Sequence, residues 1–122
     1  MNEDIDNLHS LDLEVIKMFV KMYTYAIKQG KEDEFKDIQT RANEVYKKHI
    51  DYEAEFLRSK ENKNVIVEIH RYPDKETYQK GMRLIDEEPE LKETWEDFIE
   101  ILDHDLSDIK ELDYEEFFKF EN

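Results

Sequence analysis

Two titratable side chains stand two residues apart in a segment rich in β-branched residues. Glu68 and His70 belong to the stretch VIVEIHRY, residues 65–72, which predicts a strand. Because successive strand side chains point to opposite faces, these two share one face. A carboxylate beside an imidazole can act as a general acid–base pair or supply two metal ligands. The lone Glu-x-His pattern is unspecific, however, and favours the alternative that both lie at the rim of a sheet, paired with basic residues of a dimer mate.

Tyrosines and a tryptophan are the other candidates for a site. Tyr23 and Tyr25 share one face of an earlier predicted strand, where a phenol can donate a proton or orient a polar aromatic ligand. Packing at a dimer interface, where tyrosine is favoured, is the simpler explanation, and the two roles are compatible. Candidate catalytic residues are Glu68, His70 and Tyr23, and candidate ligand contacts are Tyr25, Tyr72 and Trp95.

Trp95 lies on an aromatic stripe with Leu91, Phe98 and Ile99. A stripe at helical spacing usually belongs to a core, and this is the role we assign to it. The alternative is that Trp95 forms a wall of a ligand cavity from the helix side.

Other familiar reaction centres are missing from the sequence. There is no cysteine, and the two glycines are too far apart to form a phosphate loop. His104 stands between two aspartates, but three consecutive side chains point in different directions, so a solvated connector is the better interpretation. His49 closes a predicted helix, where its charge suits the helix dipole, and His9 carries no claim. We expect neither a metal nor a cofactor.

The chain has 122 residues, with 33 acidic and 18 basic side chains and a net charge of −15. This length predicts one domain, over residues 15–122, preceded by an acidic extension over residues 1–14. The charge argues against nucleic acid and anionic membranes as partners. No apolar run approaches the ~20 residues that span a bilayer, and the first residues lack a signal-peptide core, so we expect a cytoplasmic protein.

Periodicity predicts the order β-α-β-β-α-β. The predicted strands cover residues 15–27, 52–59, 65–72 and 114–120; the predicted helices cover residues 31–51 and 75–102, with a break near Pro89. Asp74 is a good N-cap for the second helical region. This order is typical of a ferredoxin-like α+β fold, with two helices on one face of a four-stranded antiparallel sheet.

Such a fold leaves one sheet face uncovered. We expect that face to carry the apolar and aromatic strand residues, namely Tyr23, Tyr25, Ile66, His70 and Tyr72. A face of this kind implies a partner surface, and association into a homodimer is the simplest solution.

Three segments resemble the dimeric α/β-barrel superfamily, whose members include antibiotic-biosynthesis-monooxygenase-like proteins. They are AIKQGKEDEF (residues 26–35), VEIHRYPDKETY (residues 67–78) and PELKETWEDF (residues 89–98), and the order of elements matches over residues 18–120. The resemblance implies a homodimer whose sheets face each other, each chain enclosing a small-molecule cavity between sheet and helices.

The same resemblance implies activities ranging from cofactor-independent oxygenation of aromatic polyketides to haem degradation and isomerisation. The haem-degrading branch of this superfamily typically has an Asn on the first strand, a Trp near the third strand and a His on the second helix. Here residues 15–27 hold no Asn and residues 80–82 hold no His, and Trp95 lies too late in the chain to match that Trp. Haem degradation is therefore disfavoured. We therefore expect a small-molecule-binding protein that oxygenates an aromatic substrate without a cofactor. The alternative is a non-catalytic binding or regulatory homodimer on the same fold.

Overall fold

The computed structural model describes residues 17–103 and 105–121. The extension expected over residues 1–14 lies outside this part of the chain, as do His9 and His104. None of the described helices combines the length and hydropathy that crossing a membrane requires.

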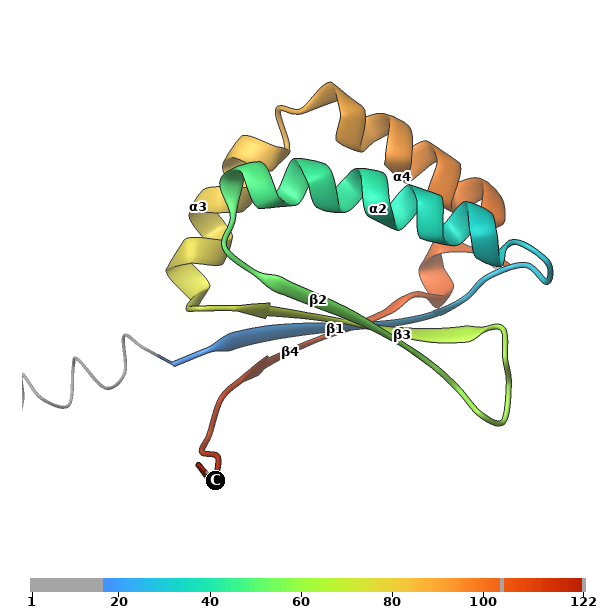
Figure 1. Cartoon of the computed structure of the whole chain (residues 1–122). Helices are drawn as coiled ribbons and strands as arrows, with labels where there is room; N and C mark the ends of the chain where they lie inside the picture. Colours follow the sequence, from blue (N-terminus) through green and yellow to red (C-terminus); the bar gives the residue numbers. More distant parts are fainter. Residues whose placement is uncertain (1–16, 104, 122) are drawn as a thin grey trace, which may run out of the picture.

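The described residues form the elements in the predicted order (Figure 1). They are β1 (Phe19–Ala26), α2 (Glu32–His49), β2 (Glu53–Arg58), β3 (Val65–Tyr72), α3 (Lys75–Ile85), α4 (Pro89–Ile101), the 3₁₀ turn η1 (Leu106–Asp108) and β4 (Lys110–Glu115). The predicted break is confirmed, because Pro89 opens α4 at a position where its missing N–H costs no helical hydrogen bond. The predicted cap is also confirmed: Asp74 Oδ1 accepts a hydrogen bond from the Thr77 backbone N–H at 2.6 Å.

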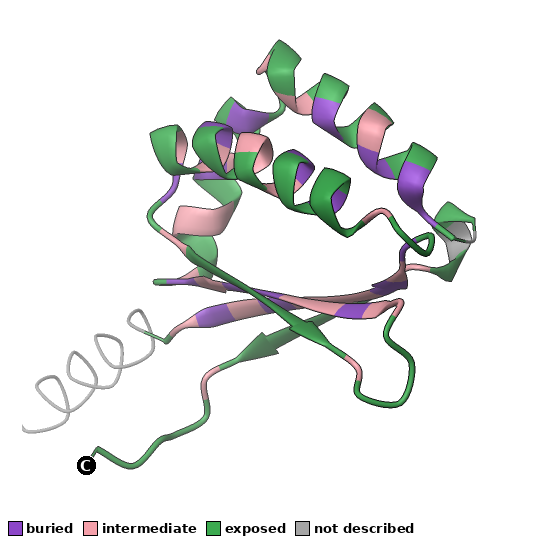
Figure 2. Ribbon diagram, turned by 45° about the vertical axis from the view of Figure 1, so that its right-hand side comes forward, coloured by how far each residue is buried: buried purple, intermediate pink, exposed green. Residues whose placement is uncertain are grey.

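The strands form one antiparallel sheet in the order β2-β3-β1-β4. Helices α2, α3 and α4 all lie on the same side of it (Figure 1). This is the ferredoxin-like α+β arrangement that the sequence predicts. The central strands β1 and β3 carry the buried sheet positions, whereas every residue of β2 and β4 is exposed (Figure 2).

The predicted assignment of residues to the two sheet faces was wrong. Tyr25, Ile66 and Tyr72 are buried against the helices, and the β1–β3 register puts Tyr23 and His70 on the same side. The alternation of a strand shows which residues share a face, but it does not show which face the helices cover. The face away from the helices instead carries Val20, Met22, Thr24, Leu57, Val67, Ile69, Leu112 and Tyr114, of which Ile69 is buried and Leu57, Leu112 and Tyr114 are exposed.

The last strand also differs from the prediction. β4 ends at Glu115, and Phe117, Phe118 and Phe120 lie beyond it with exposures of 92%, 66% and 79%. β1 begins at Phe19, which pairs with Glu115, and the Met18 carbonyl accepts one further bond from the Glu116 N–H. The aromatic residues have high β propensity but extend past the end of the strand that would pair with them.

The buried core is divided into two clusters. The larger contains Tyr25, Ile27, Phe35, Ile38, Ile66, Phe98, Ile101 and Leu102, and the smaller contains Phe19, Ile50, Tyr72 and Ile85. On β3, Ile66 belongs to the first cluster and Tyr72 to the second. Glu68 and His70 lie between them, so polar side chains interrupt the core at the middle of the sheet.

Candidate functional site

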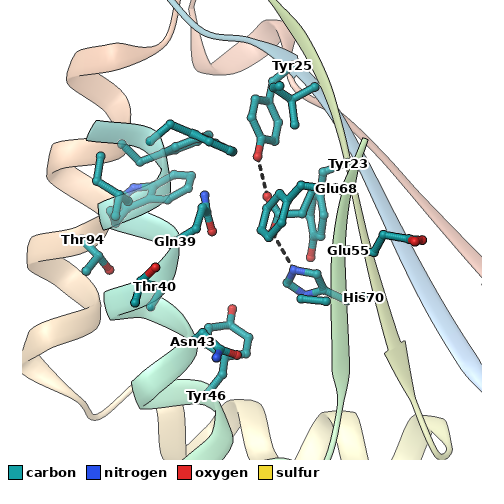
Figure 3. A pocket seen from close by; sticks show the side chains of 18 of the residues that line it. Tyr23, Tyr25, Gln39, Thr40, Asn43, Tyr46, Glu55, Glu68, His70 and Thr94 are labelled. Atoms are coloured by element: carbon teal, nitrogen blue, oxygen red, sulfur yellow. Dashed lines mark hydrogen bonds and ion pairs between the residues drawn. The ribbon is translucent and has the colours of Figure 1, made fainter. Parts of the chain in front are cut away.

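A cavity of about 1530 Å³ lies between the sheet and helices α2 and α4. Side chains from β1 and β3 form one wall, and side chains from α2 and α4 form the opposite wall (Figure 3). All six residues of β2 also line it, and because all six are exposed, the cavity reaches solvent along that strand.

The β1–β3 register brings the candidate residues together. Tyr23 pairs with Glu68, and Tyr25 pairs with Ile66 one step along the same face. Because the side-chain period of a strand is two, Glu68 and His70 also project from this face. Figure 3 shows Tyr23, Tyr25, Glu68 and His70 extending from the sheet toward α2.

Three of these side chains form a continuous hydrogen-bonded chain with Tyr72. Tyr25 Oη donates to Glu68 Oε1 at 2.6 Å, and the other carboxylate oxygen, Oε2, lies 2.5 Å from His70 Nε2. His70 Nδ1 lies 3.0 Å from Tyr72 Oη. The chain thus runs from Tyr25 through Glu68 and His70 to Tyr72, along the wall of the cavity.

The hydrogen bonds of this chain define the roles of its atoms. A carboxylate only accepts hydrogen bonds, so His70 Nε2 donates to Glu68 and Tyr25 Oη donates to its other oxygen. His70 Nδ1 and Tyr72 Oη share the remaining bond, in which the hydroxyl can donate or accept. Each Glu68 oxygen keeps the capacity to accept a second bond.

Glu68 and His70 lie inside the molecule and not at the rim of the sheet. Their side chains are 13% and 8% exposed, and they are paired with each other and with two tyrosines. The expectation that they pair with basic residues of a dimer mate at the rim is therefore wrong. β3 occupies the second position in the sheet, with neighbours on both edges, so its middle residues cannot reach the rim.

Aromatic rings surround the imidazole. The ring centroids of Tyr23 and Tyr52 lie 5.5 Å from that of His70, that of Tyr46 lies 5.9 Å away, and that of Tyr72 lies 6.1 Å away. These rings come from β1, the loop before β2, α2 and β3. The imidazole therefore occupies an aromatic enclosure built by four separate parts of the chain.

The tyrosines of this enclosure are held in the protonated state. Burial, followed by the negative charge of Glu68, raises the pKa of Tyr25 and of Tyr46 well above the ordinary value. The same two causes raise the pKa of Tyr52 to about 12. Burial is also the main reason that the pKa values of Tyr23 and Tyr72 are raised. At neutral pH these side chains are therefore neutral phenols that can donate hydrogen bonds.

Five of the six residues proposed from the sequence line the cavity; they are Tyr23, Tyr25, Glu68, His70 and Trp95. Tyr72 does not line it: its side chain is 1% exposed and lies behind His70. The assignment of Trp95 to the core was wrong, because Trp95 is 48% exposed and stacks on Phe98 at a centroid distance of 5.7 Å. Its position matches the alternative, a cavity wall on the helix side.

Two tyrosines of the site were missed in the sequence. Tyr46 falls within the predicted helix over residues 31–51 and Tyr52 within the predicted strand over residues 52–59, and neither was proposed as a site residue. Both line the cavity, and Tyr52 Oη donates to Asn43 Oδ1 at 2.6 Å. The only signal available was the high tyrosine content, seven residues in 122. No local motif links these rings to His70.

A buried cation lies beside the site but outside the cavity lining. Lys21 is 5% exposed, pairs across the strands with His70, and donates to Asp113 at 2.7 Å and Glu111 at 3.0 Å. Burial by itself lowers the pKa of Lys21, but the two carboxylates outweigh burial and raise it. Its Nζ also lies 5.2 Å from the ring centroid of Tyr78. Lys21 is thus neutralised by β4 and joins that edge strand to the core.

No group of three metal-binding side chains occurs among the described residues. His49, expected to suit the dipole of α2, also contacts a carboxylate: its Nε2 lies 2.8 Å from Glu88 Oε1. This hydrogen bond lowers the pKa of Glu88 and joins the end of α2 to the start of α4. We assign it a structural role.

Solved structures share this architecture. A NIPSNAP domain protein from Burkholderia xenovorans superposes with a TM-score of 0.62 at 18% identity, covering 79% of this chain and 91% of its own. A protein assigned as an antibiotic biosynthesis monooxygenase from Nitrosomonas europaea superposes with a TM-score of 0.61 at 16% identity, covering 83% of this chain and 91% of its own. A variant of SnoaB, a cofactor-independent oxygenase from Streptomyces nogalater, gives 0.66 at 10% identity, covering 86% and 98%.

These likenesses establish the fold. The chain has the ferredoxin-like fold that these solved structures share, as the sequence resemblance implies. No protein-family model and no curated protein sequence matches it. Any function must therefore be argued from the cavity itself.

Proposed function

We propose that the cavity binds a small aromatic molecule and that Glu68 accepts a proton from it. The observation that carries this proposal is the Glu68 carboxylate in the cavity wall, held by Tyr25 on one oxygen and by His70 on the other. Two fixed donors orient the carboxylate, and both oxygens retain acceptor capacity toward a ligand. A positioned carboxylate of this kind meets the geometric requirement for a general base.

The rest of the cavity suits an aromatic partner. Phe35, Phe98 and Trp95 line it on the helix side, and Phe56 packs edge-on against Phe35 at a centroid distance of 5.6 Å. Aromatic rings favour offset or edge-to-face contacts with a planar ligand. An apolar pocket with a few convergent polar groups is the usual form of a small-molecule site.

Oxygenation without a cofactor is the reaction that we assign to this arrangement. Dioxygen reacts slowly with a neutral, closed-shell organic molecule, and removing a proton from a ring hydroxyl makes the ring a better electron donor. Glu68 is placed to take that proton, while Tyr25 and His70 stabilise the position of the carboxylate. SnoaB, which shares the fold, is a cofactor-independent oxygenase, and this supports the assignment by analogy.

A non-catalytic binding role on the same fold is the alternative. One observation favours it: every buried polar side-chain atom among the described residues already has a hydrogen-bond partner. In that case the chain from Tyr25 to Tyr72 would serve to order the cavity wall, and a ligand would be held without reacting.

We also propose that two copies associate through the uncovered sheet face. That face carries Val20, Met22, Val67 and Leu112 in adjacent strands, and Leu112 is 52% exposed. A contiguous apolar face on a chain of net charge −15 is a typical interaction surface. Isologous pairing of two such faces buries both at once.

Calorimetry and dioxygen uptake, measured with a panel of hydroxynaphthalenes and hydroxyanthracenes, test the proposal. We expect binding to the wild-type protein and dioxygen uptake that falls by about 10²–10⁴-fold in Glu68→Gln, because the isosteric amide cannot accept the proton. Glu96→Gln makes the same chemical change on the exposed side of α4 and is expected to leave uptake unchanged. Binding without uptake would support the non-catalytic alternative, and no binding of any compound would contradict the proposal.

A further inference from the structure

Negative charge dominates the interior of the cavity. Of the charged side chains that line it, Glu68 is the most buried, at 13% exposure; Glu88 and Arg71 follow at 26% and 36%. Acidic side chains along the whole lining outnumber basic ones by seven to four. The buried cation nearby, Lys21, is outside the lining and already bound to two carboxylates.

The tyrosine rings add to this negative character. Tyr23, Tyr46 and Tyr52 line the cavity around Glu68 and His70. The face of an aromatic ring carries negative potential and attracts cations within about 6 Å of its centre. A cation that meets the face of one of these rings is therefore attracted by both the ring and the Glu68 carboxylate.

The charge of Glu68 extends to the neighbouring tyrosines. After burial, it is the next cause that raises the pKa of Tyr25, Tyr46 and Tyr52, because it opposes a second negative charge at these places. The same charge favours a positive group there. Glu68 is 13% exposed, and a largely buried charge is screened by salt less than one at the surface.

We infer that the ligand of this cavity is a hydroxylated aromatic amine in its protonated form, whose ammonium group donates to one Glu68 oxygen and leaves the other oxygen for the ring hydroxyl. The inference rests on the proposed function, since it names the chemical class of the molecule that the cavity would bind. The Glu68 oxygens hold one hydrogen bond each and can accept the new ones, and the tyrosine rings surround the cation. The aromatic part contacts Phe35, Phe98 and Trp95.

Three probes of nearly equal size and different charge test the inference. They are 2-naphthylmethylamine, 2-naphthalenemethanol and 2-naphthoate, each titrated into the full-length protein by calorimetry at neutral pH. We expect the amine to bind at least about tenfold more tightly than the alcohol, because hydrogen bonds to a charged group are worth about 1.5–3 kcal/mol and tenfold corresponds to about 1.4 kcal/mol. The carboxylate is expected to bind most weakly.

Two variants test whether Glu68 is the cause of the tighter binding of the amine. Glu68→Gln is expected to reduce the amine-to-alcohol ratio to near one, whereas Glu96→Gln, with the same loss of charge on the surface, keeps it. If the variant at Glu68 does not fold, the order of the three probes on the wild-type protein decides by itself. Equal or tighter binding of the alcohol or the carboxylate overturns this inference alone, and no binding of any probe overturns the proposed small-molecule cavity as well.

Discussion

Glu68 contacts no lysine or arginine among the described residues, and its carboxylate is hydrogen-bonded to Tyr25 and His70. A hydrogen bond from a neutral phenol orients a carboxylate without cancelling its charge. An ion pair with Lys21 would have neutralised that charge, but this lysine is bound to Asp113 and Glu111. The separation of the two charges is what leaves Glu68 able to act on a ligand.

Alkaline pH is expected to unfold the protein by ionising its buried tyrosines. Their pKa values are raised in the folded state, to about 12 for Tyr52, so the unfolded chain releases its protons first, near pH ~10. The stabilisation is complete below that pH and is lost as pH rises toward the folded values. The urea concentration at the midpoint of unfolding should therefore fall as the pH rises from about 10 to about 12. Tyr52→Phe removes one such group, so its urea midpoint should depend less steeply on pH. A wild-type midpoint that stays constant over this pH range would contradict the prediction.

At the scale of elements, α3 shows how closely the helices pack. Gly81 faces Ile50, which follows α2, and a Cβ added at Gly81 would overlap the Ile50 side chain. Glycine is unfavourable inside a helix by roughly 1 kcal/mol, so its presence here reflects the close approach of the two segments.

Gly81→Ala is expected to lower the free energy of unfolding by about 1–3 kcal/mol, because overpacking outweighs the better helix propensity of alanine. Denaturant unfolding measures this change. Lys80→Ala, one residue earlier and on the exposed side of the same helix, provides the matched control and should stay within about 0.5 kcal/mol. A more stable Gly81→Ala protein would show that α3 can move away from Ile50.

At the scale of the whole molecule, helices α2, α3 and α4 all cover the same face of the sheet (Figure 1). The cavity lies on this side, and the proposed dimer contact lies on the opposite side. The two proposals therefore assign association and ligand binding to opposite faces of the same strands, along which alternate residues of β1 and β3 point to one face or the other.

The wild-type protein is expected to sediment at twice the chain mass of 15.0 kDa. Leu112→Asp, on the uncovered face, should give a folded single chain, because a charge cannot be buried there without a partner. Leu84→Asp on α3 is the control, since Leu84 and Leu112 are 50% and 52% exposed but lie on different surfaces. Single-chain mass for the wild-type protein would contradict the proposed dimer.

The sequence by itself determined the features that depend on short-range periodicity. Alternation along residues 65–72 placed Glu68 and His70 on one face, helical spacing predicted α2, and Asp74 and Pro89 marked the starts of α3 and α4. These outcomes need only the geometry of one element, so neighbouring residues carry enough information to predict them.

Only the tertiary structure decided what these residues contact. The bond between Tyr25 and Glu68 joins positions 43 apart and depends on the β1–β3 register. The face that meets the helices depends on how the chain crosses from β1 over to β2, and Trp95 lines the cavity because of how α4 lies on the sheet. Each of these outcomes is set by the packing of distant elements, which no local pattern encodes.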